Sequence, residues 1–326
     1  MSPQSPSREA LFQPGSSFQV RLNSHEELHD MAAHWQLEPK QLARGCYTGL
    51  LQACHTSRMQ VAFARHGCGS RFEGQIPKGT MVLCLTYPSE APIQFRGRRV
   101  ADREIFVQQS EDGIDFSFMG EIRIFSVAVC RETVERRAAS LWQCDPGRIL
   151  HDGIGFCDWE SPDRVRSVMM EDLQAGLEAP EMLQTPASGR RFEQHVLDVM
   201  LAGLREPRPV EFAPARRRLA RLAAQILHER CREDLCIADL CAAVHASRRT
   251  LHLGFLEVYG VGPMAYLKIL RLNGVRREIR RARRGERNIT ISAMSWGFTH
   301  LGRFSRDYEA HFGVLPSEEP FASCTC

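Results

Sequence analysis

Residues 247–263 read SRRTLHLGFLEVYGVGP, and residues 300–316 read HLGRFSRDYEAHFGVLP. Both stretches carry apolar or aromatic residues four positions apart, and both end in Gly-Val-x-Pro. The equivalent positions are Leu251, Phe255 and Tyr259 in the first copy and Phe304, Tyr308 and Phe312 in the second. Glycine adopts the left-handed conformation that closes a helix, and proline often follows such an end. Each stretch is therefore predicted to be a helix with a constant apolar face and a polar face that differs between the copies.

A short apolar segment at helical spacing precedes each of these helices. Its inward-facing residues are predicted to be Ile237, Leu240 and Val244 before the first copy, and Ile291, Met294 and Phe298 before the second. Two helices joined by a tight turn form a helix-turn-helix, whose second helix lies in the major groove of DNA. We predict two such motifs, over residues 236–259 and 290–313. A helical pair from an ordinary bundle is the alternative, and the duplication argues against it.

The segment between the two motifs, residues 265–287, is predicted to be one long helix with a mixed face. About 22 residues span about 33 Å in a helix, which is close to one turn of DNA at about 34 Å. Two second helices held on such a rod would enter successive major grooves on one side of the duplex. Seven arginines crowd residues 276–287, and they either contact phosphates or form the solvated end of the helix.

The charge of the chain is unevenly distributed. From residue 212 onward 19 Lys and Arg oppose 11 Asp and Glu, whereas residues 1–211 hold 23 basic and 28 acidic residues. A basic last third on an acidic body indicates that only the C-terminal part meets a polyanion.

The first part of the chain has a different pattern. Residues 18–130 contain short runs of β-branched and aromatic residues, such as GTMVLCLTY and IRIFSVAVC, separated by Gly, Pro and charged turns. This spacing favours a sandwich or a small barrel. Ser24 and Glu27 form a capping-box pattern at the start of a helix. The apolar stripe of a later helical segment, residues 190–205, is expected either to mediate dimerisation or to cap the barrel.

Three prolines, at positions 207, 209 and 214, block helix formation and predict a linker. The chain is thus predicted to be an α+β protein, with a small β-barrel-like N-terminal domain, flanking helices, and a C-terminal all-α double helix-turn-helix domain. The predicted boundaries are a disordered lead over 1–17, the first domain over 18–206, the linker over 207–214, the second domain over 215–320 and a tail over 321–326.

Other features exclude several classes of protein. No apolar run approaches 18 residues, and the N-terminus lacks a signal-peptide pattern, so we expect a cytoplasmic protein with no membrane partner. The twelve cysteines form no CxxC pair and are expected to be reduced and mostly buried. Candidate metal ligands are present at His55, His66, Cys68 and Glu73, but they lack the spacing of a site, and we expect no metal. Because GxSxG, GxGxxG and GxxxxGK[ST] are all absent, we do not expect an enzyme.

The last 110 or so residues resemble the DNA-binding domain of the AraC/XylS family of bacterial transcription regulators. The resemblance is carried by AMSWGFTHLGRFSRDYEAHFGVLPSE, residues 293–318, with its Gly-Phe turn, spaced aromatic residues and late proline. The first copy, with its SRRTL and LKILRLNGVRRE strings, is similar to regulators of the ethanolamine-utilisation operon within that family. The resemblance implies a sequence-specific DNA-binding transcription regulator, more specifically an effector-responsive activator.

The family also implies which side chains face DNA. Arg249 is expected to donate two hydrogen bonds to O6 and N7 of a guanine. His252 is expected to contact a base edge, and Leu253 either a thymine methyl group or no base. Gly302, which has no side chain, makes readout at its position doubtful. The implied base-reading positions are Arg249, His252 and Leu253 in the first motif, and Leu301, Gly302, Arg303 and Arg306 in the second. The implied contacts to the DNA backbone are Ser247, Arg248, Thr250, Lys268, Arg276, Thr299, His300 and Ser305.

In this family the N-terminal domain senses a small molecule or mediates dimerisation. The resemblance therefore implies promoter DNA, RNA polymerase, a small-molecule effector and a homodimeric partner. Ethanolamine, a cobalamin or both would be the effectors if the ethanolamine branch applies, and no effector-binding residue is identified. The alternative is a DNA-alkyl-repair protein, which joins a similar DNA-binding module to a reactive cysteine. That chemistry uses a Pro-Cys-His-Arg string, and no cysteine here follows a proline.

Overall fold

The structure is a computed structural model that describes residues 12–32, 35–96, 98–109, 113–143, 145–148, 150, 153–156, 161–204, 215–282 and 288–320. Parts of several predicted segments lie outside these residues. They are the lead up to residue 11, the linker over 207–214, the arginine-rich residues 283–287 and the tail over 321–326.

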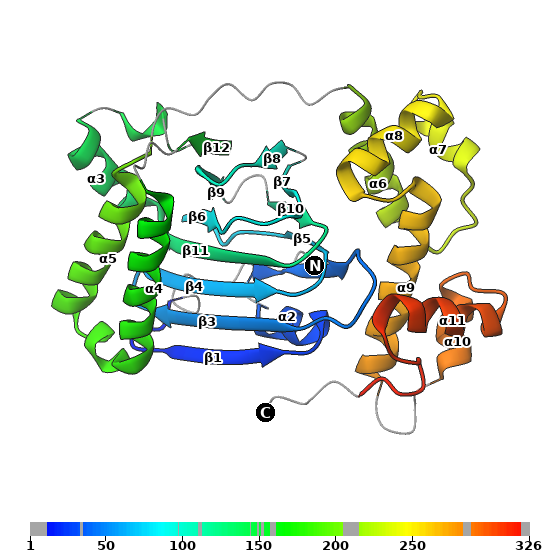
Figure 1. Cartoon of the computed structure of the whole chain (residues 1–326), viewed down its shortest axis with the longest axis horizontal. Helices are drawn as coiled ribbons and strands as arrows, with labels where there is room; N and C mark the ends of the chain where they lie inside the picture. Colours follow the sequence, from blue (N-terminus) through cyan, green and yellow to red (C-terminus); the bar gives the residue numbers. More distant parts are fainter. Residues whose placement is uncertain are drawn as a thin grey trace.

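The N-terminal part of the chain forms two antiparallel β-sheets (Figure 1). The larger sheet has the strand order β1 (Ser17–Leu22), β3 (Gly49–His55), β4 (Met59–His66), β11 (Ile122–Cys130), β6 (Thr80–Thr86), β9 (Glu104–Gln109) and β12 (Gly153–Phe156). The smaller sheet has the order β2 (Glu38–Gln41), β5 (Ser70–Gly74), β10 (Ile114–Phe118), β7 (Ile93–Phe95) and β8 (Arg98–Val100). One apolar core contains residues of both sheets, so the sheets face each other.

The larger sheet is buried on both faces, as β6 shows. Val82 and Cys84 belong to the core shared with the smaller sheet, whereas Met81, Leu83 and Leu85 belong to a second core on the opposite face. Side chains alternate between the two faces of a strand. Both faces are covered, which explains why β6 has a continuous apolar run, Met81 to Leu85, rather than an alternating one.

The second core lies between the larger sheet and a group of helices, α3 (Arg131–Trp142), α4 (Pro162–Glu178) and α5 (Pro186–Leu201). Figure 1 shows these helices on one side of the strands and the C-terminal helices on the other. The apolar stripe predicted over 190–205 belongs to α5, where Val196 and Met200 are fully buried in this core. The stripe therefore covers the sheet, which is one of the two roles expected from the sequence.

A short helix, α2 (His25–Met31), starts at the predicted capping box. The hydroxyl of Ser24 accepts a hydrogen bond from the backbone N–H of Glu27 over 3.2 Å, and Glu27 Oε2 accepts one from the N–H of Asn23 over 2.9 Å. The predicted cap at Ser24 is thus confirmed, whereas the reciprocal bond of Glu27 goes to Asn23 rather than to the cap residue. The cap at Ser24 fixes where α2 begins.

The C-terminal part is helical. Its described helices are α6 (Ala215–Glu229), α7 (Ile237–Ala243), α8 (Arg248–Tyr259), α9 (Pro263–Arg281), α10 (Ile289–Ser295) and α11 (Leu301–Phe312). The predicted α+β organisation, with a sheet domain followed by a double helix-turn-helix domain, is confirmed by these elements. Gly260 and Gly313, with φ of 70° and 77°, close α8 and α11 in the predicted left-handed conformation.

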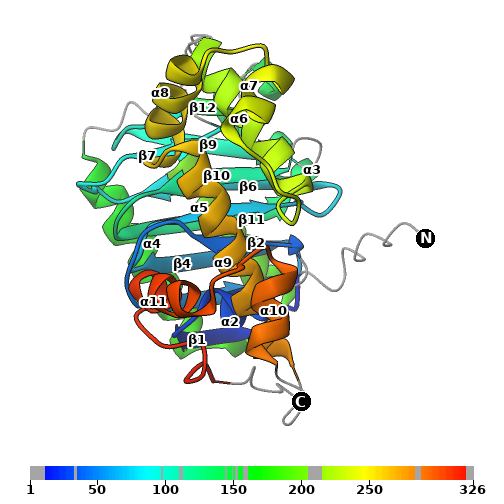
Figure 2. The ribbon, with the colours of Figure 1, turned by 90° about the vertical axis from the view of Figure 1, so that its right-hand side faces the viewer.

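Helix α9 joins two separate apolar cores. Ile269 and Leu270 pack in one core with α6, α7 and α8, whereas Val275 and Ile279 pack in the other with α10 and α11. Figure 2 shows α9 running from the first group of helices to the second. It has 19 residues and spans about 28 Å at 1.5 Å per residue, so the predicted rod is present but shorter than expected.

The apolar face predicted before α11 was wrong at Ile291 and Met294, whereas Phe298 packs against the core of the second motif as predicted. Ile291 and Met294 are 64% and 63% exposed, and the fully buried residue of this helix is Ala293, which takes the place of Leu240 in the first motif. The small side chain of Ala293 suits the close approach of α10 to α9, where Trp296 at the end of α10 packs over Gly274. A Cβ atom on Gly274 would lie 2.3 Å from the indole ring.

No single helix among the described residues is both long and apolar enough to cross a membrane. The pair formed by α8 and α9, bent by 49°, meets the length and composition limits together.

Candidate nucleic-acid interface

The first motif presents the outer face of α8 to solvent. Leu251, Phe255 and Tyr259 are fully buried beneath it, so the opposite face is fixed in position. Arg249 is exposed and forms no ion pair with another described residue, and Leu253 is 40% exposed. His252 is exposed but lies against the start of α9, because a Cβ atom on Gly262 would be 2.8 Å from its Cε1. The three predicted base-reading residues of α8 thus occupy one accessible face.

The start of α8 is fixed by Ser247, whose hydroxyl accepts a hydrogen bond from the N–H of Thr250 over 3.1 Å. The two hydroxyls are also 2.9 Å apart within hydrogen-bonding geometry. Ser247 and Arg248 are exposed, and Thr250 is half-buried. A helix N-terminus with free N–H groups and hydroxyls is a common phosphate-binding element. This end of α8 therefore has the chemistry predicted for contacts to the DNA backbone.

The second motif presents α11. Leu301 is 37% exposed, Gly302 and Arg306 are exposed, and the side chain of Arg303 is 76% exposed. A Cβ atom on Gly302 would meet no heavy atom within 4 Å, so the glycine leaves an open position in the middle of this face. Arg306 Nε donates a hydrogen bond to the carbonyl of Gly302 over 3.4 Å. Arg303 and Arg306 are thus the charged base-reading candidates of α11 that are exposed to solvent.

Lys268 and the remaining backbone-contact candidates surround α11. Lys268 Nζ lies 2.5 Å from Asp307 Oδ2, and Arg303 Nε lies 3.8 Å from the same oxygen. Asp307 therefore holds both cations next to a groove between α9 and α11 that Thr299 and His300 also line. Thr299 and His300 are exposed, whereas Ser305 is half-buried. Lys268 must exchange its carboxylate partner for a phosphate if it is to bind DNA.

The predicted contact between Arg276 and the DNA backbone was wrong. Arg276 is only 5% exposed, its Nε lies 2.8 Å from Glu319 Oε1, and its guanidinium stacks 4.4 Å from the ring centroid of Phe312. Helical spacing explains the error, because residues four apart share a face and Arg276 and Arg280 both point inward. Arg277 and Arg281 of the same run are more exposed.

Arg276 and Arg280 form part of a buried ionic cluster that joins the two domains, here called the clamp. Its members are Glu26, Glu27, Arg276, Arg280 and Glu319. Arg280 Nε lies 3.6 Å from Glu26 Oε2, its Nη2 lies 3.5 Å from Glu27 Oε1, and its Nη1 donates to Glu319 Oε2 over 3.0 Å. Glu26 and Glu27 belong to α2 of the first domain, whereas the arginines belong to α9. The clamp therefore ties α2 to the helix that joins the two motifs.

Beside the clamp, Gln41 of β2 connects the domains through hydrogen bonds. Its N–H donates to Asn273 Oδ1 over 3.1 Å, and its Nε2 donates to the carbonyl of His311 over 2.9 Å. Burial lowers the pKa of His311 to about 4, so its imidazole stays neutral in the interface. These bonds fix α9 and the end of α11 against the smaller sheet.

Helices α6 and α8 contact the smaller sheet through a charged group around Glu73. Lys40 Nζ pairs with Glu73 and donates a hydrogen bond to His228 Nδ1 over 2.9 Å. Burial alone would raise the pKa of Glu73, but the charges of Arg71 and Lys40 lower it to about 2. The Arg71 guanidinium also lies 5.0 Å from the ring centroid of Tyr259 in α8. The base-reading face of α8 is left outside these contacts.

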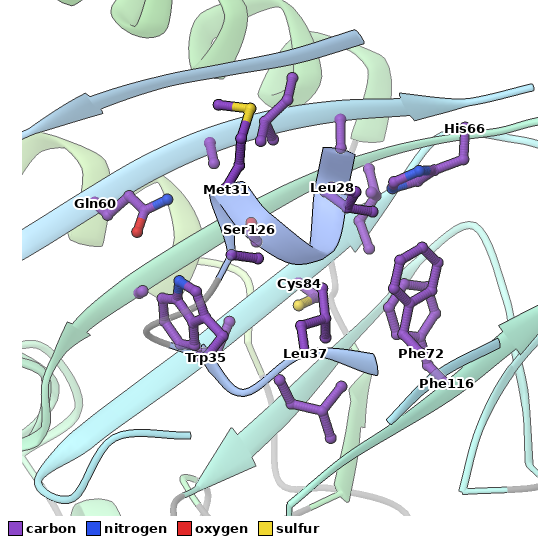
Figure 3. Close-up of a pocket in the computed structure, with 18 of the residues that line it drawn as sticks. Leu28, Met31, Trp35, Leu37, Gln60, His66, Phe72, Cys84, Phe116 and Ser126 are labelled. Carbon is purple, nitrogen blue, oxygen red and sulfur yellow. The ribbon is translucent and has the colours of Figure 1, made fainter. Parts of the chain in front are cut away.

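A cavity of about 160 Å³ lies between the two sheets beneath α2 (Figure 3). Most of its lining is apolar or aromatic, and Phe72 and Phe116 stack at one end with ring centroids 4.9 Å apart. Leu28, Met31 and Ala32 contribute from the α2 region. The sequence did not identify this cavity, since its lining comes from many strands and each residue alone is an ordinary core residue.

The metal candidates are not assembled into a site. His66 lines the cavity, where its Nδ1 accepts a hydrogen bond from the Tyr47 hydroxyl over 2.7 Å, and Glu73 belongs to the interface with Lys40. Cys68 Sγ lies 3.5 Å from the carbonyl of Ala43. Within the described ranges, no group of three His, Cys, Asp or Glu residues is arranged to hold a metal ion.

Comparison with known proteins places the C-terminal part among helix-turn-helix proteins. A family model described as "Helix-turn-helix domain" matches residues 240–319. The "Probable thc operon regulatory protein" of Rhodococcus erythropolis is 32% identical over 155 residues, which are 46% of this chain and 47% of that protein. The "XylDLEGF operon transcriptional activator 2" of Pseudomonas putida is 33% identical over 94 residues, 29% of this chain and 60% of that protein. The chain thus spans about half the length of the first relative and less than two thirds of the second.

A solved structure of a probable AraC family transcriptional regulator from Rhodopseudomonas palustris CGA009 is 29% identical, with 31% of this chain and 94% of that chain covered and a TM-score of 0.30. The relatives described above are named as a regulator and an activator of transcription, in agreement with the expectation that the chain is not an enzyme. These matches show a helix-turn-helix domain over residues 240–319 and a similarity of part of the chain to regulators of operon transcription.

Proposed function

We propose that the chain is an effector-responsive transcription regulator that reads two adjacent major-groove segments of promoter DNA with α8 and α11. The observation that carries this proposal is the accessibility of both reading faces. Arg249 and Arg303 are exposed on helices whose opposite faces are fully buried, while the first domain contacts other surfaces of α8, α9 and α11. Arg249, His252 and Leu253 read one segment, and Leu301, Arg303 and Arg306 read the other, with Gly302 leaving room for a base or a methyl group.

Response to an effector is supported by the position of α2. Leu28 and Met31 of this helix line the cavity, whereas Glu26 and Glu27 of its first turn belong to the clamp on α9. A helix of seven residues moves as a unit, so a ligand that shifts Leu28 also shifts the carboxylates that hold Arg280. The cavity and the helix joining the two motifs are thus mechanically connected.

Reactive-cysteine chemistry, the alternative class, finds no support in the buried thiols. Burial raises the pKa of Cys54, Cys68 and Cys84 to about 12, 11 and 12, whereas a nucleophilic thiol needs a lowered pKa. We further propose RNA polymerase as a partner, a homodimer as the assembly and the cytoplasm as the location. Activation of the target operon is likewise proposed by analogy with the relatives.

The proposal is tested by selecting binding sites from randomised duplex DNA with the full chain. The enriched sequences are expected to contain two conserved segments about 10 base pairs apart from centre to centre. Binding to them is expected to weaken steeply with salt, since basic side chains release counterions from DNA. Enrichment of a single conserved segment, or of none, would contradict the proposal.

A further inference from the structure

The cavity beneath α2 has no charged lining. None of the described residues around it is Asp, Glu, Lys or Arg. The one ionisable ring, His66, is held neutral because burial lowers its pKa to about 3, and burial raises the pKa of the Cys84 thiol to about 12. A charged ligand would lose its hydration here without gaining a counter-charge, which is strongly unfavourable.

The size of the cavity sets a second limit. An engineered apolar cavity of about 150 Å³ in another protein holds a benzene molecule, and the cavity here is about 160 Å³. A molecule with a single ring fits this space, whereas a cobalamin, with its fused macrocycle, does not. Ethanolamine would fit by volume, but its ammonium group would find no carboxylate. Neither effector expected from the ethanolamine branch suits this cavity.

One fully buried polar atom of the lining, Gln108 Oε1, lacks a hydrogen-bond partner among the described residues. Gln108 is 3% exposed, its Nε2 donates to the sulfur of Cys84 over 3.6 Å, and its Oε1 has no hydrogen-bond partner among the described residues. If the amide of Gln108 were flipped, Oε1 would face the Cys84 thiol and Nε2 would lack a partner instead. In either orientation one buried polar atom requires a partner, and such atoms are rarely left unpaired. A hydroxyl or an amide in the cavity supplies that partner, because each can donate and accept.

We infer that this cavity binds an uncharged molecule of single-ring size that is apolar except for one hydroxyl or amide group, which pairs with Gln108. The inference rests on the proposed function, since it names the chemical class of the effector. The selectivity follows from three independent features of the lining: its neutrality, its volume and the unpaired buried amide oxygen of Gln108.

The test uses four compounds that share one ring and differ in one substituent: benzyl alcohol, toluene, benzylamine and benzoate. Isothermal titration calorimetry of the full chain at pH 7.5, without DNA, is expected to show saturable binding of benzyl alcohol. Toluene is expected to bind about tenfold more weakly because it leaves Gln108 unpaired. The benzylammonium cation and the benzoate anion are expected to bind at least 100-fold more weakly. Either charged compound within tenfold of benzyl alcohol, or no saturable binding of any of the four, would overturn the inference.

Gln108→Leu isolates the polar contact, and Gln52→Leu is its matched control. Gln52 is 8% exposed, but its amide pairs with Gln19 and does not line the cavity. Gln108→Leu should reduce the affinity for benzyl alcohol to that for toluene, and Gln52→Leu should leave it unchanged. Equal binding of benzyl alcohol and toluene to the unmodified chain would refute the pairing even if Gln108→Leu did not fold. Site selection in DNA without any compound tests the reading function separately, so two conserved segments with no ligand selectivity would overturn this inference alone.

Discussion

Arg280 in α9 donates a hydrogen bond to Glu319 Oε2 over 3.0 Å, and both side chains are almost completely withdrawn from solvent. Glu319 follows the last helix of the second motif and also faces Arg276 and the hydroxyl of Tyr308. One carboxylate therefore contacts two buried guanidinium groups between the domains, and Glu26 and Glu27 supply further negative charge. Arg276 and Arg280 belong to the arginine run that the sequence suggested for phosphate contacts, but here they form ion pairs within the protein.

Glu319→Ala is expected to destabilise the chain by about 3–5 kcal/mol, because it leaves Arg276 and Arg280 buried with less compensation. The measurement is the free energy of unfolding from denaturant titration. Glu318→Ala is the matched control, since Glu318 is exposed and accepts only a hydrogen bond from the N–H of Leu315 over 3.3 Å. It should change stability by about 0.5 kcal/mol or less. Equal effects of the two substitutions would show that the cluster does not stabilise the fold.

Gly274→Ala is expected to destabilise the second motif, although alanine normally favours a helix over glycine by about 1 kcal/mol. The added Cβ would lie 2.3 Å from the Trp296 ring, and such overpacking costs about 1–3 kcal/mol. Gly302→Ala, whose Cβ would meet open space, should instead leave stability unchanged or raise it slightly. Thermal unfolding of both variants measures the contrast. A stabilising Gly274→Ala would disprove the close packing of α10 on α9.

The interface around His228 predicts a dependence of stability on pH. Burial lowers the pKa of His228 to about 3, with Lys40 nearby adding to the effect. A lowered folded-state pKa means that the unfolded chain binds the proton first. The stability from this residue is therefore complete above pH 6.5 and is lost as pH falls from 6.5 toward 3. Between pH 6.5 and 5.5 the loss should be about 1 kcal/mol.

His228→Gln removes this titration and should make the unfolding free energy less steep over the same interval by about that amount. Denaturant titrations of both proteins at the two pH values provide the measurement. Identical slopes for the two proteins would mean that His228 is not held neutral in the folded state.

Arg248→Ala is expected to weaken binding to all DNA sequences alike and to reduce the salt slope by about 1, as befits a phosphate contact. Arg248 is exposed at the capped start of α8, next to Arg249 in sequence. Binding measured at several salt concentrations, on the selected site and on unrelated DNA, tests this directly. A change confined to the selected site would instead make Arg248 a base-reading residue.

The sequence predicts much of the second domain because its signals are local. Gly260 and Gly313 end their helices where expected. The residues predicted to form the apolar faces of α8 and α11 are all buried, namely Leu251, Phe255, Tyr259, Phe304, Tyr308 and Phe312. The error at Ile291 and Met294 arose because Trp296 and Gly274, twenty-two positions apart, set the packing of α10.

The clamp and the cavity could not be predicted from the sequence. Arg276 reads as one of several arginines at the end of a helix, and its partners are Glu319 and the start of α2, some 250 residues earlier. The cavity collects residues from strands of both sheets, which no periodicity of a single strand reveals. Both features depend on contacts between residues far apart in the sequence. Such contacts also explain why Arg276, which was predicted to contact DNA, forms an ion pair within the protein instead.

The central claim is that α8 and α11 read different segments of one DNA site. Repeating the site selection with Arg249→Ala and with Arg303→Ala tests it most directly, with Arg164→Ala, an exposed arginine of the first domain, as the control. Each reading variant is expected to lose preference at one conserved segment by about 1–3 kcal/mol and to retain preference at the other. If both variants selected the unmodified site, or if both lost preference at the same segment, the two helices would not be independent readers.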